Sequence, residues 1–370
     1  MFAIQRDDFV RTLFEGLSEE EQARYHLGKT LARIETTGTG VAVTCEDGSV
    51  YNGSIVVGAD GAHSKTRTLM RILARAAVKG TSPHPFGSNA ELVAGADAGS
   101  NPENPYKAEY RLLWCSFPRQ PSLALGDGWV AHGEGGSLQS LITPTRSNIF
   151  IYERIPEEEI TVHGHGRRRY TEKEVDDFAK RWGHLPIGPT LRIKDIYPMR
   201  FSSGLTNINE GLTPHWSWGG RVVLVGDACH TMTPNQGIGC INGIQDAATL
   251  VNGLRALLSS GTDGIREPSA VQLQEVFHQY QDAREDPLKV DFETTATQTR
   301  MAAWETWKYW LLDRHILTWM PMFDDVLVSW AGWKHFRKAP VLDFVEGEET
   351  MHGRITWVNK IPAPGSMDRR

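Results

Sequence analysis

The segment from Arg221 to Leu258 constrains the fold more than any other part of the chain. Its sequence, RVVLVGDACHTMTPNQGIGCINGIQDAATLVNGLRALL, predicts a buried strand, a carboxylate, a glycine-containing loop and a helix, in that order. An apolar run such as Val222 to Val225 is typical of a central parallel strand. Asp227 follows this run at the strand end where open α/β sheets bind their ligands. We therefore predict a cofactor site here, with Asp227 accepting hydrogen bonds from a polyol.

The loop behind Asp227 is suited to a close approach by a ligand. Pro234, Gly237 and Gly239 delay helix formation and leave backbone N–H groups accessible. Asn242, followed three residues later by Gln245, predicts that the helix begins there, and a helix N-terminus favours negative charge. Apolar residues at helical spacing predict a face that packs against the sheet. They are Ile244, Ala247, Ala248, Val251, Leu254 and Leu258.

A second strand that ends in an acid lies upstream. The run from Ile55 to Val57 leads into a glycine-containing turn that holds Asp60 and Gly61, and Arg67 follows shortly after. Because both segments share this order, we expect both turns at the same edge of one sheet, where they could grip one extended cofactor. Asp-Gly is also ordinary turn chemistry, so a purely structural role for Asp60 stays open.

The two motifs resemble those of a known family. GADGAHSKTR at 58–67, together with GDACHTMTP at 226–234 and the glycines at 237 and 239, is similar to the downstream motifs of single-component FAD-dependent monooxygenases of the para-hydroxybenzoate hydroxylase type. The stretch 210–221 resembles fungal epoxidases of indole-diterpene and meroterpenoid pathways. The resemblance implies FAD as the cofactor, with Asp227 at its ribityl chain. The cofactor-binding residues that it implies are Arg6, Asp60, Gly61, Asp227, Pro234, Gly237, Gly239, Cys240, Ile241 and Asn242.

The resemblance also implies a reaction. NAD(P)H would reduce the flavin, and one oxygen atom of O₂ would reach an electron-rich ring or alkene, by epoxidation or hydroxylation. The protein would stabilise the negative edge of the reduced flavin with the N–H groups of residues 237–242. No side chain is assigned as a catalytic acid or base. The implied substrate is a small apolar molecule of secondary metabolism, of terpenoid, prenylated or polyketide-derived origin.

Two departures from the family limit this interpretation. No GxGxxG follows an N-terminal strand, and roughly a hundred residues of the family pattern, about two or three strand–helix–strand units, are lacking. Ile238 and Ile241 stand where the family usually has Gln and Asn. Three explanations stay open: a shortened sequence of a longer enzyme, a degenerate relative, or a flavin-free protein that binds or cyclises the same class of substrate.

Composition excludes several other functions. With 39 basic and 45 acidic side chains and a formal charge of −6, the chain offers no general attraction to nucleic acid. Its four cysteines have no CxxC spacing, and the N-terminus lacks the apolar run of a signal peptide, so we expect a reducing, cytoplasmic location. The histidine- and arginine-rich loop at 163–169 is more typical of a solvated connection than of a metal site.

The predicted fold class is α/β. It comprises an incomplete Rossmann-like FAD-binding domain at 1–85 and 200–290, an antiparallel-sheet substrate domain at 86–199, and a helical C-terminal region at 291–370. Alternating residues predict a meander at 41–60 and longer strands between 110 and 155. Thr171 and Glu174 form a capping box and predict a surface helix to Trp182.

The C-terminal region is rich in tryptophan. Trp304, Trp307 and Leu311 would share one helical face, which we interpret mainly as core; contact with a membrane surface or an apolar substrate is the alternative. No uncharged span of ~20 residues exists, so a transmembrane helix is not expected. The sequence leaves the oligomeric state open. The further tryptophans of this region are Trp310, Trp319, Trp330 and Trp333.

Overall fold

The computed structural model describes residues 5–37, 39–78, 100–126, 128–163, 168–259, 267–317, 336–349 and 356–366. The chain divides into two compact units. Unit 1 comprises residues 1–29, 107–209 and 297–319, and unit 2 comprises 30–106, 210–296 and 320–370. The predicted boundaries differ from this division, because the first 29 residues and part of the C-terminal region belong to the unit of the antiparallel sheet. The functions assigned to the domains stay predictions.

Unit 2 contains the parallel strand pair that the sequence predicts. Strand β11 (Val222–Leu224) lies between β10 (Ser217–Trp218) and β4 (Val56–Gly58), antiparallel to the first and parallel to the second. Val223 pairs with Val57, and Leu224 pairs with Gly58. Because the two strands are parallel, their carboxyl ends, and the turns that follow them, lie at the same sheet edge, as predicted.

A separate antiparallel meander precedes β4. It consists of β1 (Leu31–Thr36), β2 (Val41–Cys45) and β3 (Val50–Gly53), in that order. The turn between β2 and β3 contains Gly48 at a φ of 83°. Such a φ is strained for other residues, so this position favours glycine. The meander predicted at 41–60 is therefore confirmed only for the hairpin of β2 and β3, since its first strand is β1 and the strand at 56–58 belongs to the sheet of β11.

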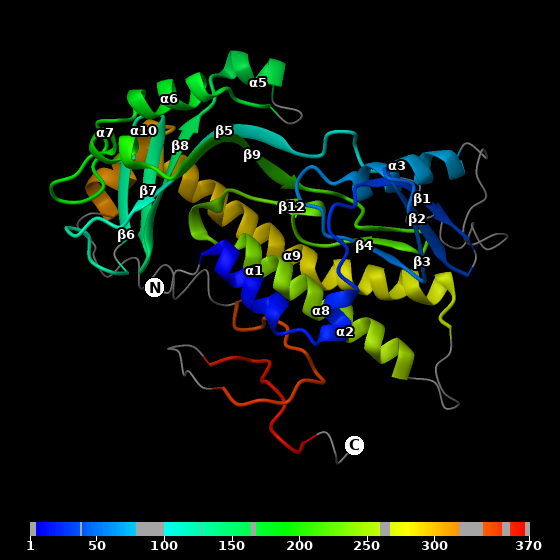
Figure 1. Cartoon of the computed structure of the whole chain (residues 1–370). Helices are drawn as coiled ribbons and strands as arrows, with labels where there is room; N and C mark the ends of the chain where they lie inside the picture. The colour runs from blue at the N-terminus through cyan, green and yellow to red at the C-terminus, as the bar shows by residue number, and fades with distance from the viewer. Residues whose placement is uncertain are drawn as a thin grey trace. The chain divides into compact units, whose positions relative to one another are not determined.

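The long helices in the described part of unit 2 are α3 (Lys65–Val78), α8 (Gly239–Ser259) and most of α9 (Ala270–Ala302). In Figure 1, α8 and α9 lie side by side, and hydrogen bonds join them. The apolar side chains around β11 form one core with residues of α3 and α9. Its buried members include Trp216, Val223, Leu224, Phe277 and Tyr280. Complete burial of such a side chain contributes roughly 1.5–3 kcal/mol.

Helix α8 corrects two predictions. It begins at Gly239 and not at Asn242, because the chain leaves the turn at 234–236 through Gly237, which has a φ of 69°. The predicted apolar face is also largely wrong, since Ile244, Val251 and Leu258 are 55%, 40% and 47% exposed. The buried positions are Asn242, Asp246, Ala248 and Leu250. Asn242 and Asp246 face inward because they form hydrogen bonds with Arg284 of α9, and Asp246 also with Gly226.

Unit 1 is built on an antiparallel sheet. Its strands are β9 (Ser202–Leu212), β5 (Lys107–Pro118), β8 (Arg146–Arg154), β7 (Gly136–Ile142) and β6 (Gly128–Gly133), in that spatial order. The last residues of β9 belong to unit 2, where Leu212 pairs with His230 of β12 (His230–Thr231). The extended runs predicted between 110 and 155 are therefore confirmed.

Helices α6 (Glu172–Arg181) and α7 (Ile193–Ile196) cover one face of this sheet (Figure 1). The capping box of Thr171 and Glu174 forms as predicted. The buried side chains between the sheet and these helices include Leu113, Phe117, Ile151, Phe178 and Trp182. The described part of unit 1 also contains α1 (Arg6–Glu15), α2 (Glu19–Ala23), α5 (Glu157–His163), α10 (Trp307–Leu311) and the end of α9.

The tryptophan-rich region differs from its prediction. Trp304 precedes α10 with a φ of 47°, so it shares no helical face with Trp307, and Trp307 is 69% exposed. A π-helix at 312–316 follows α10. Trp319, Trp330 and Trp333 lie outside the described residues, as does most of the loop at 163–169. Among the helices that the structure describes, none is long and apolar enough to span a bilayer.

Candidate cofactor site

The candidate site lies at the carboxyl ends of β4 and β11. Gly58, the last residue of β4, leaves no room for a side chain, because a Cβ there would lie 2.7 Å from Cγ2 of Thr66 and 2.9 Å from Cδ2 of Leu224. The end of β4 therefore packs directly against the first turn of α3. It thereby fixes the turn at 59–64 relative to β11.

Asp60 organises that turn. Its carboxylate accepts hydrogen bonds from Oγ of Ser64, and from the backbone N–H and Oγ1 of Thr66 at 2.9 and 3.0 Å. Gly61 follows at a φ of 79°. Both Asp60 oxygens thus satisfy donors at the start of α3, which is the structural role that the sequence left open. Its predicted contact with a cofactor stays a prediction.

Asp227 lies in the second turn, a single 3-10 turn at 226–228 that directly follows β11. Gly226 has a φ of 58°, a conformation that favours glycine, and Asp227 is exposed. The backbone carbonyl of Asp227 accepts a hydrogen bond from the hydroxyl of Tyr106 at 3.2 Å. Burial raises the pKa of the Tyr106 hydroxyl far above its usual range, so it remains a donor at physiological pH.

Arg67 joins the two turns. Its buried guanidinium donates to the carbonyl of Ala62 at 2.7 Å in the first turn and to the carbonyl of Ala228 at 2.6 Å in the second. It also lies over the ring of Tyr106, 4.5 Å from the centroid. Arg67 is the last residue of the first motif in the sequence. Its hydrogen bond to the second turn was not predicted, because Ala228 is 161 positions away along the chain.

Asp246 of α8 supports the turn at 226–228 through a hydrogen bond from Gly226. Its fully buried carboxylate accepts the N–H of Gly226 at 2.9 Å and lies 2.6 Å from Nε2 of His230 and 2.8 Å from Nε of Arg284. Burial acts to raise the pKa of this carboxyl. The hydrogen bond and charge of His230 and the charge of Arg284 outweigh burial, so the pKa lies below its usual value of 3.8.

Asn242 belongs to the same buried network. Its side-chain oxygen accepts from Arg284 at 2.6 Å, and its side-chain nitrogen donates to Asp291 at 2.9 Å. Arg284 also donates to Gln245 at 2.7 Å. The side-chain amide of Asn242 is therefore used inside the protein, while its predicted flavin contact stays a prediction.

The N-terminus of α8 completes the site. The N–H of Asn242 bonds to the carbonyl of Ile238 at 3.0 Å, whereas the N–H groups of the three preceding residues have no carbonyl of their own helix within reach. Pro234, Gly237, Cys240 and Ile241 are exposed, and Gly239 is half-buried. This loop therefore presents backbone donors at the positive end of a 21-residue helix, which suits an anionic or electron-rich group.

Comparisons with known proteins agree with this geometry. Residues 202–310 match a family model described as an FAD binding domain. FAD-dependent monooxygenase DEP2 of Alternaria brassicicola is 28% identical over 99% of this chain and 64% of its own length. FAD-dependent monooxygenase srdH of Neurospora crassa is 29% identical over 96% of this chain and 76% of its own length.

The chain is therefore similar to FAD-dependent monooxygenases, and the matched family model places an FAD binding domain at 202–310. It spans less than two thirds of the length of DEP2.

The chain also resembles solved structures in its fold. Klebsiella pneumoniae HpxO, solved with FAD and uric acid, aligns with a TM-score of 0.56 at 16% identity, over 90% of this chain and 69% of HpxO. A substrate complex of salicylate hydroxylase aligns with a TM-score of 0.58 at 18% identity, over 89% of this chain and 72% of the hydroxylase. At these identities the likeness concerns the fold alone.

The residues of unit 2 fit the FAD expected in this monooxygenase family. Asp227 is an exposed acceptor at the carboxyl end of β11, and the α8 N-terminus supplies backbone donors beside it. Arg6 lies in unit 1, where it begins α1 with an exposed side chain. The structure thus brings the other predicted residues together at one sheet edge, while the place of Arg6 beside a flavin stays a prediction.

One cluster in this region has the residue types of a metal site. Ligand atoms of Cys229, His230 and Asp246 lie within 4.8 Å of one another. However, Arg284 and Gly226 already occupy the Asp246 carboxylate, and burial raises the pKa of the Cys229 thiol well above its usual value. A protonated thiol and an arginine-paired carboxylate are poor metal ligands, so we interpret the cluster as part of the turn's support.

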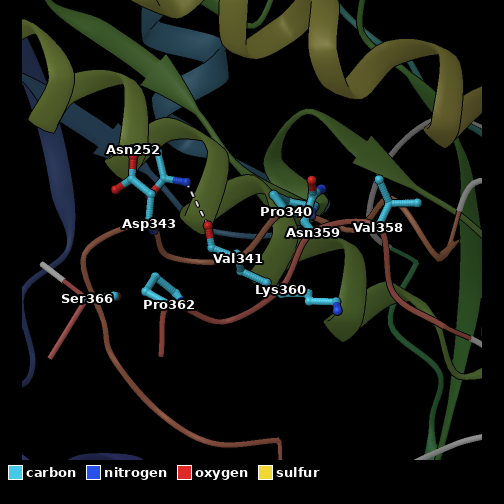
Figure 2. Close-up of a pocket in the computed structure, with 9 residues that line it drawn as sticks. All are labelled: Asn252, Pro340, Val341, Asp343, Val358, Asn359, Lys360, Pro362 and Ser366. Atoms are coloured by element: carbon cyan, nitrogen blue, oxygen red, sulfur yellow. Dashed lines mark hydrogen bonds between the residues drawn. The ribbon is translucent and has the colours of Figure 1, made fainter. Parts of the chain in front are cut away.

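A cavity of about 570 Å³ lies elsewhere in unit 2, between α8 and the C-terminal segment (Figure 2). Asn252 of α8 donates to the carbonyl of Val341 at 2.7 Å and accepts the N–H of Asp343 at 3.2 Å. These bonds attach the segment to the helix. None of the predicted cofactor-binding residues lines this cavity, so it is distinct from the candidate site.

Proposed function

We propose that this chain binds FAD and catalyses an NAD(P)H- and O₂-dependent monooxygenation of a small apolar molecule of secondary metabolism. One observation carries the proposal: parallel pairing of β4 and β11 brings the turns of Asp60 and Asp227 to one edge, beside the N-terminus of α8. This is the part of an open α/β sheet where nucleotide cofactors bind.

The roles of the residues follow from their placement. FAD supplies the redox chemistry with O₂. Asp227 accepts hydrogen bonds from ribityl hydroxyl groups, which holds the flavin at the end of β11. The N–H groups of Gly239, Cys240 and Ile241, together with the α8 dipole, would favour negative charge on a bound flavin beside them. These groups are fixed before the cofactor binds, so they need no rearrangement during the reaction.

The substrate class is proposed from the second face of the unit 1 sheet. Trp114 of β5 is partly exposed there, and Phe150 of β8 pairs with it across the strands. The indole of Trp114 lies flat against Gly204 of β9, where a Cβ would approach the ring to 2.8 Å. Leu112 and Val130 extend the same face, by strand alternation and register. Gln139 lies between Phe150 and Val130 in this register and adds one amide to the face. The aromatic and aliphatic side chains suit a terpenoid, prenylated or polyketide-derived molecule, to be epoxidised or hydroxylated.

The first test is flavin binding. Purified protein titrated with FAD should develop flavin absorbance that NADH or NADPH bleaches. Asp227→Ala should weaken FAD binding by roughly tenfold, because it removes a charge-assisted hydrogen bond. Asp286→Ala is the control, since this side chain is 93% exposed. Absence of binding by the wild type at micromolar FAD, or equal affinity of the Asp227→Ala protein, would refute the proposal.

Turnover is tested by mass. Apolar pathway intermediates incubated with protein, FAD, NAD(P)H and ¹⁸O₂ should yield a product with one labelled oxygen. If labelled product never forms although FAD is bound and bleached, the protein oxidises NAD(P)H without oxygenating those substrates, and the proposed substrate class is wrong.

A further inference from the structure

Asp246 has a buried carboxylate that supports the turn at 226–228. It is not one of the predicted cofactor-binding residues. It occupies the second turn of α8, and three nitrogen groups converge on it from three different elements. They are the N–H of Gly226, Nε2 of His230 and Nε of Arg284, at 2.9, 2.6 and 2.8 Å. Each oxygen of the carboxylate therefore has a partner.

The bond to Gly226 matters most for the site. The N–H of Gly226 belongs to the Val225–Gly226 peptide, one residue before Asp227, so the orientation of this peptide influences where the Asp227 side chain projects. A Cβ at Gly226 would lie 3.8 Å from Cα of Gly243, which places the turn directly against the first turn of α8. A buried N–H that loses its acceptor is costly, so without Asp246 this peptide would turn toward another partner.

Arg284 prevents Asp246 from moving. It lies on α9 and also donates to Asn242 and Gln245 of α8, so its guanidinium connects two helices while it holds Oδ1 of Asp246. Oδ2 accepts the hydrogen bond of the Gly226 N–H and lies beside Nε2 of His230. Hydrogen bonds between charged groups are stronger and more directional than neutral ones, which makes this a rigid support.

We propose that Asp246 is a positioning residue of the flavin site: its carboxylate, oriented by Arg284 and His230, fixes the Gly226 peptide so that Asp227 is presented at the end of β11. The effect on FAD rests on the proposed function. The effect on the turn itself does not, because the network is complete within the protein.

Hydrogen–deuterium exchange of the protein without FAD tests the turn. The variant is Asp246→Asn, which keeps the size of the side chain but offers one carbonyl oxygen where three donors converge. The Gly226 amide should exchange about tenfold faster or more, while Val223 in the middle of β11 should exchange as in the wild type. Asp286→Asn, an exposed carboxylate on the helix of Arg284, should change neither amide. Unchanged Gly226 exchange in folded Asp246→Asn protein overturns the proposal, as does an equal rise at Val223, which would indicate general destabilisation.

FAD affinity then tests the consequence. If the wild type binds FAD, Asp246→Asn should bind it about tenfold more weakly, and Asp286→Asn should bind it normally. Equal affinity of the Asp246→Asn protein overturns the role toward the cofactor. If the wild type does not bind FAD, the proposed function is wrong, and the exchange of Gly226 alone decides whether Asp246 positions the turn.

The proposal remains testable if Asp246→Asn does not fold. In the wild-type protein, the Gly226 amide should then be strongly protected although it lies in a turn. Gly226 exchange as fast as that of an amide in an unstructured peptide would show that the carboxylate does not hold this peptide.

Discussion

At the residue scale, Gly58 is required by packing. The space that a side chain would need is filled by Thr66 and Leu224. We expect Gly58→Ala to lower the free energy of unfolding by about 1–3 kcal/mol, because the new Cβ forces β4 away from α3. Gly53→Ala is the matched control, since its Cβ would lie 3.6 Å from its nearest neighbour, an ordinary contact. Denaturant unfolding measures both, and equal stability of the two variants would contradict the packing argument.

Asp246 should also make stability depend on pH. The folded protein holds the pKa of this carboxyl below its usual value of 3.8, so ionised Asp246 stabilises the folded state at every pH above that value. This contribution is lost as the pH falls through the lowered pKa. The difference in unfolding free energy between wild type and Asp246→Asn should therefore shrink as the pH falls from about 5 toward 3. A difference that does not change with pH would mean that Asp246 is already protonated in the folded state.

The sequence alone predicts the position of Asp227 at the end of a strand, but it does not predict the role of Asp246. Asp227 was predictable because strand, acid and glycines are adjacent in the sequence. Asp246 was not, because its partners Gly226, His230 and Arg284 come from separate elements. One signal was present, since Asn242 and Asp246 lie four residues apart, on one helical face with Leu250. Polar side chains on a face shared with an apolar residue can mark a buried network rather than a solvent-facing side.

At the element scale, the best predictions rest on local chemistry. The cap of α6 is an example, because Thr171 accepts the N–H of Glu174 while the Glu174 carboxylate accepts the N–H of Thr171. The start of α8 was misplaced for the opposite reason. Asn242 resembles an N-cap in sequence, but the left-handed backbone of Gly237 allows the helix to begin earlier, and burial assigns Asn242 to Arg284 and Asp291.

The cap of α6 gives a direct test of this local reasoning. Thr171→Ala should lower the free energy of unfolding by about 1 kcal/mol, because it leaves the N–H of Glu174 without its acceptor. Thr171→Ser keeps the hydroxyl and should be close to the wild type. Thermal or denaturant unfolding of the three proteins decides the matter. A Thr171→Ser protein as unstable as Thr171→Ala would assign the effect to the lost methyl group.

At the scale of the whole molecule, each unit has a hydrophobic core of its own. Phe178 belongs to the core of unit 1, and Phe277 to that of unit 2. Replacement of either by alanine should cost about 3–5 kcal/mol. We expect Phe178→Ala to raise amide exchange mainly within residues 107–209, and Phe277→Ala to raise it mainly around β11. Equal changes in both units after either substitution would show that the cores unfold together.

The division into units was only partly predictable. The antiparallel sheet and the parallel pair follow from strand patterns, but residues 1–29 and 297–319 join the unit of the antiparallel sheet, and the sequence gives no sign of this. The exposure of Trp307 was also not predictable from the sequence. Its aromatic side chain and spacing favoured a core position, whereas α10 begins at Trp307 itself and leaves it exposed.

The bridge between the two turns has a consequence for the order of assembly. Arg67 and Ala228 are 161 positions apart, so a ribosome must synthesise all the intervening chain before the second turn can meet the first. Long-range parallel pairing of this kind forms slowly. The growing chain will therefore carry an open strand edge at Val56–Gly58 until Val222–Leu224 has been synthesised, a period in which chaperones can protect it from aggregation.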